Sequence, residues 1–214
     1  MQKIALITGV LAVAGSANAF VPWSNPNGSG SFFNWSNGGS DNGLFGSPTL
    51  VGDNFVFFPS NFRAQSPNGS PIVSDRLQFE LEAFVGSEFS NITIQEIGDY
   101  GNLGGGGGNL VQANMALFTT DLNQFRVVQD NQTFTAPAGL GNWNLSASTA
   151  LDGSVQKWTK IRVVLNNNLI AISGANGVTF IEKKVTGGII IRVPTPGSLA
   201  LLGIGGLVAV RRRR

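Results

Sequence analysis

The chain contains no cysteine and no histidine, and this limits the chemistry that it can perform. Histidine-based catalytic triads, thiol nucleophiles and ordinary zinc sites all need one of these two residues. Carboxylates, amides and tryptophans are the groups that remain for catalysis or recognition. The glycine run Gly104–Gly108 is not followed by the Lys and Ser or Thr of a phosphate-binding loop. We therefore expect a plain hairpin loop there and no cofactor.

Two carboxylates stand two residues apart in the stretch DRLQFELEAF, Asp75–Phe84. Apolar and polar residues alternate in this stretch, which predicts a strand with one buried face and places Glu80 and Glu82 together on the other. Their Cβ atoms would lie about 6.5–7 Å apart, a separation that overlaps the one used in glycoside hydrolysis. A solvated outer face is the simpler interpretation, and a carboxylate hydrolase is the alternative.

Glu96 breaks the pattern of its own stretch, NITIQEIGDY, because strict alternation puts it on the same face as Ile92 and Ile94. Either a β-bulge turns the side chain outward, or the carboxylate is partly buried and paired. A buried, paired acid can mark a functional site, but ion pairs with lysine or arginine perturb acids in the same way. We expect a structural ion pair. The hydrolase alternative needs Glu96 beside a second acid in a cleft.

Hard oxygen ligands for calcium occur in three predicted loops, at Asp41–Asn42, Asp53–Asn54 and Asp121–Asn123. None continues into the acidic pattern of an EF-hand loop. Asx residues that cap turns explain these positions more simply, so we expect no metal site.

Four tryptophans, Trp23, Trp35, Trp143 and Trp158, could stack on sugar rings. Alternation in the stretch KWTKIRVVL, Lys157–Leu165, places Trp158 on the polar face of its strand, so Trp158 and Trp143 are the candidate glycan-binding residues. Packing in the core is the competing interpretation, because tryptophan is mostly buried on average.

The charge distribution argues against nucleic acid as a partner. Residues 20–192 carry nine of the 14 Lys and Arg and all 12 Asp and Glu, so their net charge is about −3. A nucleic-acid interface needs clustered basic residues, which this region lacks.

Short alternating stretches separated by Gly, Asn, Pro and Ser turns predict an all-β fold for residues 20–192. We expect one antiparallel β-sandwich, jelly-roll-like, of about eight to ten strands. Residues 20–48 are rich in Gly, Ser and Asn and are expected to be irregular or to form short edge strands held by their aromatic rings. The predicted strands are Asn54–Phe58, Asp75–Phe84, Asn91–Ile97, Val111–Thr119, Phe125–Gln129, Lys157–Leu165, Leu169–Ser173 and Gly188–Val193.

Both ends of the sequence have the features of export signals. Residues 1–19 contain one lysine, an apolar stretch and the small-residue pattern Ala17-Asn18-Ala19, which is typical of a signal peptide cleaved after Ala19. At the other end, the apolar run Leu199–Val210 is followed by four arginines, Arg211, Arg212, Arg213 and Arg214. With two preceding residues the run makes a helix of about 21 Å, shorter than a hydrocarbon core of about 30 Å. The arginines are expected to stay in the cytoplasm as a stop signal.

The last 22 residues, 193–214, resemble the PEP-CTERM sorting signal of Gram-negative bacteria in the order and spacing of their parts. Val193, Pro194, Thr195 and Pro196 correspond to the family's V-P-E-P motif, with Thr195 in place of its glutamate. The resemblance implies cleavage near this motif by a membrane protease, an exosortase. It also implies retention in the inner membrane during sorting and delivery to the cell surface or exopolysaccharide matrix.

These features together predict an exported, non-enzymatic structural component of an exopolysaccharide or biofilm layer. The first alternative is a carbohydrate-binding module that uses Trp143 and Trp158. The second is the carboxylate-dependent glycoside hydrolase.

Overall fold

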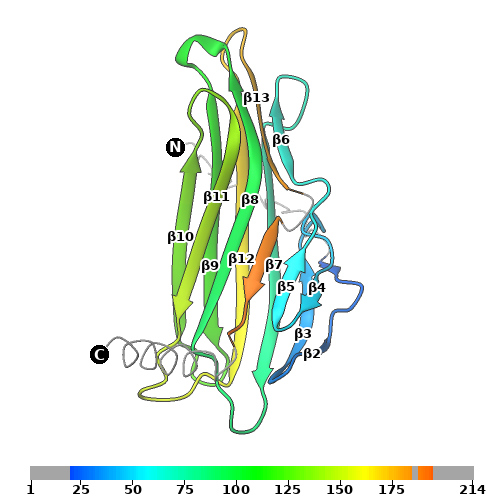
Figure 1. Cartoon of the computed structure of the whole chain (residues 1–214), viewed down its shortest axis with the longest axis vertical. Helices are drawn as coiled ribbons and strands as arrows, with labels where there is room; N and C mark the ends of the chain where they lie inside the picture. The colour runs from blue at the N-terminus through cyan, green and yellow to red at the C-terminus, as the bar shows by residue number, and fades with distance from the viewer. Residues whose placement is uncertain (1–19, 185–187, 195–214) are drawn as a thin grey trace, which may run out of the picture.

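A computed structural model describes residues 20–184 and 188–194 of the chain. Within these ranges, 14 strands form two antiparallel sheets (Figure 1). The predicted all-β fold is therefore confirmed, with more strands than expected. The segments predicted to carry the signal peptide with Ala17 and Ala19, and the residues Thr195, Pro196 and Arg211 to Arg214, lie outside the described ranges. No helix in the described part of the chain is long and apolar enough to cross a bilayer.

Sheet A has the strand order β1-β3-β7-β12-β9-β10, and β2 pairs with β3 beside this path. Its strands are β1 (Val21–Pro22), β2 (Gly28–Ser29), β3 (Phe33–Ser40), β7 (Ile72–Ala83), β9 (Leu110–Asp121), β10 (Val127–Thr135) and β12 (Lys160–Ile172).

Sheet B has the order β4-β5-β14-β8-β13-β6, and β11 pairs with the other edge of β8. Its strands are β4 (Thr49–Val51), β5 (Asn54–Phe57), β6 (Arg63–Ser66), β8 (Asn91–Leu103), β11 (Gly139–Ala150), β13 (Val178–Lys183) and β14 (Ile189–Arg192).

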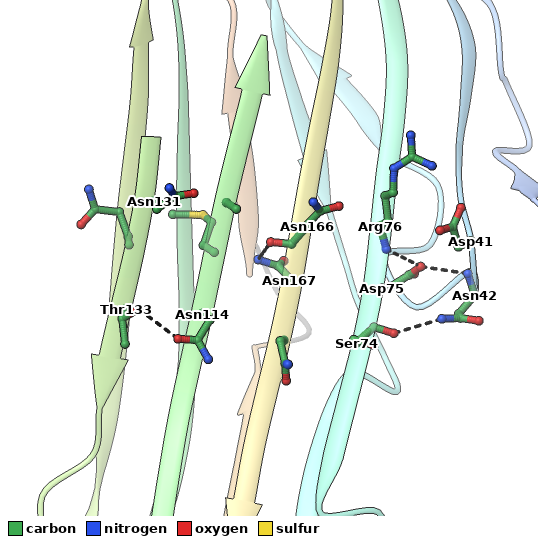
Figure 2. A pocket seen from close by; sticks show the side chains of 14 residues that line it. Asp41, Asn42, Ser74, Asp75, Arg76, Asn114, Asn131, Thr133, Asn166 and Asn167 are labelled. Atoms are coloured by element: carbon green, nitrogen blue, oxygen red, sulfur yellow. Dashed lines mark hydrogen bonds between the residues drawn. The ribbon is translucent and has the colours of Figure 1, made fainter. Parts of the chain in front are cut away.

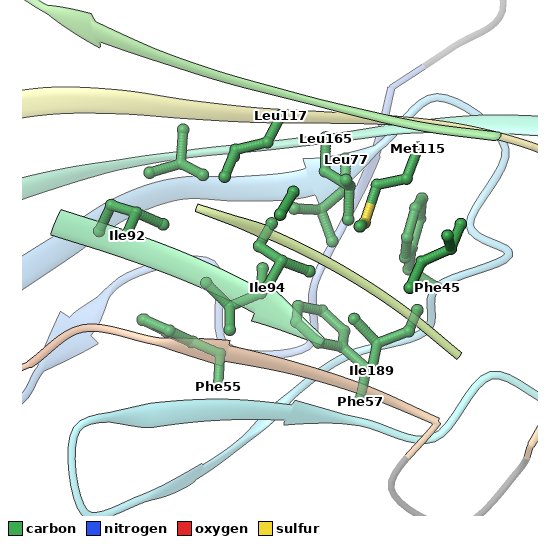
Figure 3. Packing of buried hydrophobic residues seen from close by; sticks show 14 of the residues in the cluster. Phe45, Phe55, Phe57, Leu77, Ile92, Ile94, Met115, Leu117, Leu165 and Ile189 are labelled. Carbon is green, nitrogen blue, oxygen red and sulfur yellow. The ribbon is translucent and has the colours of Figure 1, made fainter. Parts of the chain in front are cut away.

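The two sheets enclose one cluster of buried apolar side chains, which is the arrangement of a β-sandwich (Figure 3). The period-2 pattern builds this core: Leu77, Phe79 and Leu81 of β7 are fully buried, as the sequence predicts. Ile92 and Ile94 of β8 face them from sheet B. Burial of these alternating residues fixes which face of each sheet points outward, and hence which residues can meet a ligand.

The Gly-, Ser- and Asn-rich region 20–48 is more regular than expected. Its central part forms β3, an inner strand of sheet A between β1 and β7. A register shift between Ser36 and Gly39 bends this strand. At Gly38 a Cβ atom would lie 2.1 Å from the Trp23 ring, so glycine is required for the ring to cover the strand. The prediction that aromatic rings hold this region to the body is confirmed, because Trp23 and Phe33 are buried.

Two further predictions about connections are wrong. Lys157–Leu165 and Leu169–Ser173 were predicted as separate strands, but β12 continues through the polar residues 166–168. The Gly104–Gly108 segment is not a hairpin loop, because it connects β8 of sheet B to β9 of sheet A through a short 3-10 turn, Gly105–Gly107. Asn109 joins this connection to the β12–β13 loop by accepting a hydrogen bond from the backbone N–H of Gly174 at 2.8 Å.

Candidate functional site

A polar groove crosses the outer face of sheet A (Figure 2). Because the alternate residues of each strand are buried, their neighbours form rows of side chains that run across the strands. The strand register sets one row as Thr133, Asn114, Asn168 and Ser74, from β10, β9, β12 and β7. Four neighbouring strands thus each contribute one small hydrogen-bonding side chain to the same line.

The next row of the groove contains Asn131, Ala116, Asn166 and Arg76, again one residue from each strand. Ala116 has the smallest side chain of the four, so the surface of the sheet is recessed there between the longer side chains of its neighbours. The cavity over these rows has a volume of about 540 Å³. It is wide enough for a small ligand or for part of a linear polymer.

One wall of the groove is the loop after β3, and a buried carboxylate fixes its position. Asp75 accepts hydrogen bonds from the backbone N–H groups of Asn42 and Leu44, both at 2.8 Å. The Asn42 amide also donates to the carbonyl oxygen of Ser74 at 3.0 Å. These bonds place Asp41 and Asn42 at the edge of the groove. Asn42 therefore acts here as part of a wall held by hydrogen bonds.

Side chains at the β9–β10 side of the groove hold one another in a defined orientation. Thr133 donates to the Asn114 amide oxygen at 2.9 Å, and the Asn114 amide nitrogen donates to Gln112 at 3.3 Å. Gln112 donates in turn to Thr135 at 3.2 Å. This chain of hydrogen bonds pre-orders polar groups before any ligand arrives.

Three amides in the groove have unused hydrogen-bonding capacity. Among the described residues, the side chains of Asn131, Asn166 and Asn168 contact no hydrogen-bond partner. The Asn168 amide oxygen is in addition buried, and a buried acceptor without a partner costs free energy. Each amide can donate two hydrogen bonds and accept two. The groove can therefore receive a ligand that carries many hydroxyl groups.

One aromatic side chain lies on the same outer face, next to the groove. Phe118 follows Ala116 by two residues on β9 and is partly exposed. Its register neighbours are Gln129 of β10 and Val164 of β12. A ring flanked by an amide and an aliphatic side chain offers an apolar surface beside the polar one.

The carboxylates Glu80 and Glu82 are on the outer face of sheet A, as predicted, but each pairs with a cation of β12. Glu80 contacts Arg162 at 2.8 Å, and Glu82 contacts Lys160 at 2.9 Å. The hydrogen bond from Lys160 to Glu82 and the charge of that carboxylate raise the pKa of Lys160 above its usual value. These cross-strand ion pairs occupy both carboxylates.

Glu96 is buried beside Ile92 and Ile94, and no bulge turns it outward. Its carboxylate pairs with Lys183 of β13 at 2.5 Å, and both side chains are essentially inaccessible to solvent. The predicted structural ion pair is confirmed. Glu96 therefore does not line a cleft, which was the requirement of the hydrolase alternative.

The two tryptophans predicted to bind glycans are in the core. Trp143 is 3% exposed and donates to the Glu182 carbonyl oxygen, and Trp158 is 2% exposed and donates to that of Asp152. Trp158 lies before the start of β12 and forms an isolated β-bridge with Phe89. The alternation of buried and exposed residues in β12 therefore does not extend to Trp158. This burial contradicts the alternative in which the two rings form a stacking platform, and it confirms the competing interpretation, packing in the core.

Two of the calcium candidates are engaged in hydrogen bonds. Asp121 accepts from the backbone N–H of Asn123 at 2.9 Å, which is the expected Asx turn, and from Arg126 at 2.7 Å. Burial alone would raise the pKa of Asp121, but Arg126 and the backbone N–H groups of residues 123 and 124 hold that pKa below its usual value. Asp53 accepts from the hydroxyl and backbone N–H of Ser31.

No protein-family model and no curated protein sequence matches the chain. Among solved structures, a slight likeness exists to TmCBM61 in complex with β-1,4-galactotriose. That pair has 10% identity and a TM-score of 0.32, over 80% of this chain and 97% of the other. The enzymatically active domain of tailspike protein 4 from bacteriophage CBA120 has 12% identity and a TM-score of 0.27, over 77% of this chain and 20% of the other. At these TM-scores the likenesses carry no conclusion about function.

Proposed function

We propose that this chain is a non-enzymatic protein that binds a polysaccharide in the groove on sheet A. The supporting observation is that Asn131, Asn166 and Asn168 present amides without partners to the same cavity. Sugar hydroxyl groups both donate and accept hydrogen bonds, so one carbohydrate can satisfy amide oxygens and amide nitrogens together.

The layout of the groove favours a chain of neutral sugars that lies across the strands. Neighbouring strands are about 4.8 Å apart, which is close to the width of one pyranose ring. Each of four neighbouring strands can therefore contact one of four successive sugars through one side chain. The lining contains two carboxylates, Asp41 and Asp75, and one cation, Arg76, so the groove has no excess of positive charge that would select an acidic polymer. Phe118 adds an apolar surface for the face of a sugar ring.

The proposal includes an exported location. The features of residues 1–19 and the apolar run with arginines in residues 193–214 support export and a stage at the inner membrane. Val193, the first residue of the V-P-T-P motif, is buried in the sandwich, so the motif begins inside the folded body. An exosortase would then act on the segment after Pro194 and deliver a polysaccharide-binding protein to the matrix.

The experiment is affinity electrophoresis of the full chain through gels that contain neutral polysaccharides. The variants Asn166→Ala and Asn168→Ala each remove one amide from the groove. Loss of a hydrogen bond worth about 0.5–1.5 kcal/mol weakens binding about 2- to 12-fold.

Asn144→Ala is the matched control, because Asn144 is exposed on β11 of sheet B, away from the groove. It should leave retardation unchanged. Equal retardation of all three variants and the unmodified chain would exclude the groove as the binding site, and no retardation in any gel would contradict the proposed function.

A further inference from the structure

Three loops of the sandwich each carry one large apolar side chain that is almost fully exposed to solvent. Val85 is in the loop 84–90 between β7 and β8, Phe125 in the loop 122–126 between β9 and β10, and Val155 in the loop 151–159 between β11 and β12. Their exposed fractions are 107%, 81% and 92%, the three largest among the exposed large apolar residues of the described ranges. We call Val85, Phe125 and Val155 the apolar tips.

The strand register places all three loops at one end of the sandwich, the lower end in Figure 1. Lys160 at the start of β12 pairs with Glu82 at the end of β7. Ala150 at the end of β11 pairs with Asn91 at the start of β8. The end of β9 pairs both with the start of β10 and with the start of β12. The tips therefore project from the same edge of the molecule.

Contacts between the loops hold the tips in fixed positions relative to one another. Arg126 donates to the Gln156 carbonyl oxygen at 3.0 Å, which joins the second loop to the third. Lys157 contacts Glu88 at 3.6 Å, and Trp158 bridges Phe89, which joins the third loop to the first. The apolar tips therefore belong to one surface whose three loops are connected by these contacts, and the loops are not independent of one another.

The backbone at Phe125 keeps its ring pointing outward at some cost. Its φ is 56°, in the left-handed region that residues other than glycine rarely adopt. The Phe125 N–H donates to the Asp121 carbonyl oxygen at 2.8 Å, and the Asp121 carboxylate is itself bound by Arg126. A strained conformation fixed by surrounding hydrogen bonds is a feature that often accompanies function.

The described chain leaves the fold at this same end. β14 runs toward the start of β8, since Arg192 pairs with Thr93, and Pro194 is the last described residue. The apolar run Leu199–Val210 begins five residues later, within a reach of about 17 Å for extended chain. The start of the apolar run is therefore separated by no more than this length from the end of the sandwich that carries the apolar tips.

We propose that the end of the sandwich that carries the apolar tips docks on a lipid bilayer, with Val85, Phe125 and Val155 entering its interfacial region. Apolar side chains gain free energy when they leave water for this layer. The neighbouring Arg126 and Lys157 are paired with Asp121 and Glu88, so docking does not depend on anionic lipids. The groove is on a face rather than at this end, and it stays open in the docked orientation. This inference goes beyond polysaccharide binding and does not rest on it.

The test introduces one tryptophan as a reporter into the full chain. The four native tryptophans are all buried and also fluoresce, so the emission of the unmodified chain under the same conditions is subtracted to leave the emission of the added reporter. Phe125→Trp and Val155→Trp place the reporter at two apolar tips. Leu140→Trp is the matched control, because Leu140 is 69% exposed and lies near the start of β11, at the opposite end of the sandwich. Each variant is mixed with phosphatidylcholine vesicles whose acyl chains are brominated, and with unbrominated vesicles.

The expected result is that brominated lipid reduces reporter fluorescence at least about twofold at both tips and leaves the Leu140→Trp reporter unchanged, because only groups within the bilayer approach the bromine atoms. Equal quenching at the two ends would overturn the docking orientation. Failure of the chain to float with the vesicles would overturn the proposal altogether. A blue-shifted reporter without quenching would show that protein, not lipid, covers the tips, and would also overturn it.

Discussion

The ion pair between Glu96 and Lys183 is the most unusual feature at the scale of single residues. Both side chains are sealed in the core, and the Lys183 ammonium lies 5.0 Å from the centre of the Phe62 ring and 5.4 Å from that of Trp143. Burial lowers the pKa of Lys183, while the Glu96 carboxylate acts in the opposite direction. One oxygen of Glu96 has no hydrogen-bond partner in the described structure. The pair is thus costly to bury and strongly coupled.

Lys183→Met should destabilise the fold by about 3–5 kcal/mol, because it leaves Glu96 charged and alone in the core. The double variant Lys183→Met with Glu96→Leu should recover most of this loss, since a buried pair can be replaced by apolar residues at little cost. Urea unfolding of the three proteins measures both effects. A single variant as stable as the unmodified chain would show that the pair is not coupled in this way.

At the scale of elements, β8 is the strand of sheet B that pairs with three others, β11, β13 and β14. One of its edges pairs with β11 over residues 91–102, and its other edge pairs with β14 over residues 93–96 and with β13 over residues 98–103. Gly98 is located where the second edge passes from β14 to β13. A Cβ atom there would lie 2.0 Å from the Glu182 carbonyl oxygen and 2.4 Å from the Trp143 ring. Only glycine lets the ring and the neighbouring strand approach this closely.

Gly98→Ala should therefore destabilise the protein by about 1–3 kcal/mol, through overpacking of the core against backbone that cannot move far. Gln95→Ala, an outward-facing position of the same strand, should change the free energy of unfolding by less than about 0.5 kcal/mol. The midpoint of thermal unfolding gives the comparison. If the two substitutions cost the same, the close approach at Gly98 does not limit the packing.

At the scale of the whole molecule, the two proposed binding surfaces do not compete. The groove crosses the outer face of sheet A. The loops that carry the apolar tips are at the end of the sandwich toward which β14 runs, the lower end in Figure 1. A protein held at the membrane in this way can meet a polysaccharide beside it. Release from the membrane would then leave the groove unchanged.

Replacement of Arg211 to Arg214 with serine should leave the protein unprocessed or mislocalised, because uncharged residues no longer stop the segment on the cytoplasmic side. Fractionation of cells into inner membrane, surface and medium measures the distribution. The glycan affinity of the variant should not change, since the arginines are remote in sequence from the groove. The same distribution as for the unmodified chain would contradict the role of the arginines in sorting.

The sequence predicts those elements in which apolar and polar residues alternate. The strand at Asp75–Phe84 and the burial of Glu96 both follow from period-2 alternation, since a strand can only present successive residues to opposite faces. β11, with the sequence GLGNWNLSASTA, was not predicted. Its small and polar residues are typical of turns, and only its complete pairing with β8 makes it a strand.

The groove also depends on tertiary structure. The local pattern indicates that Asn114, Asn166 and Asn168 alternate with apolar or buried neighbours, but it does not show which strands are adjacent. The order β7-β12-β9-β10 is what aligns these amides with Asn131 in one cavity. Likewise, the pattern alone predicted Trp158 to be exposed, and a bridge to Phe89 from a distant loop buries it. Alternation is a property of residues that are close in the sequence, so the sequence alone is enough to predict it. Which strands lie side by side depends on pairing between distant parts of the chain, so it is determined only in the tertiary structure.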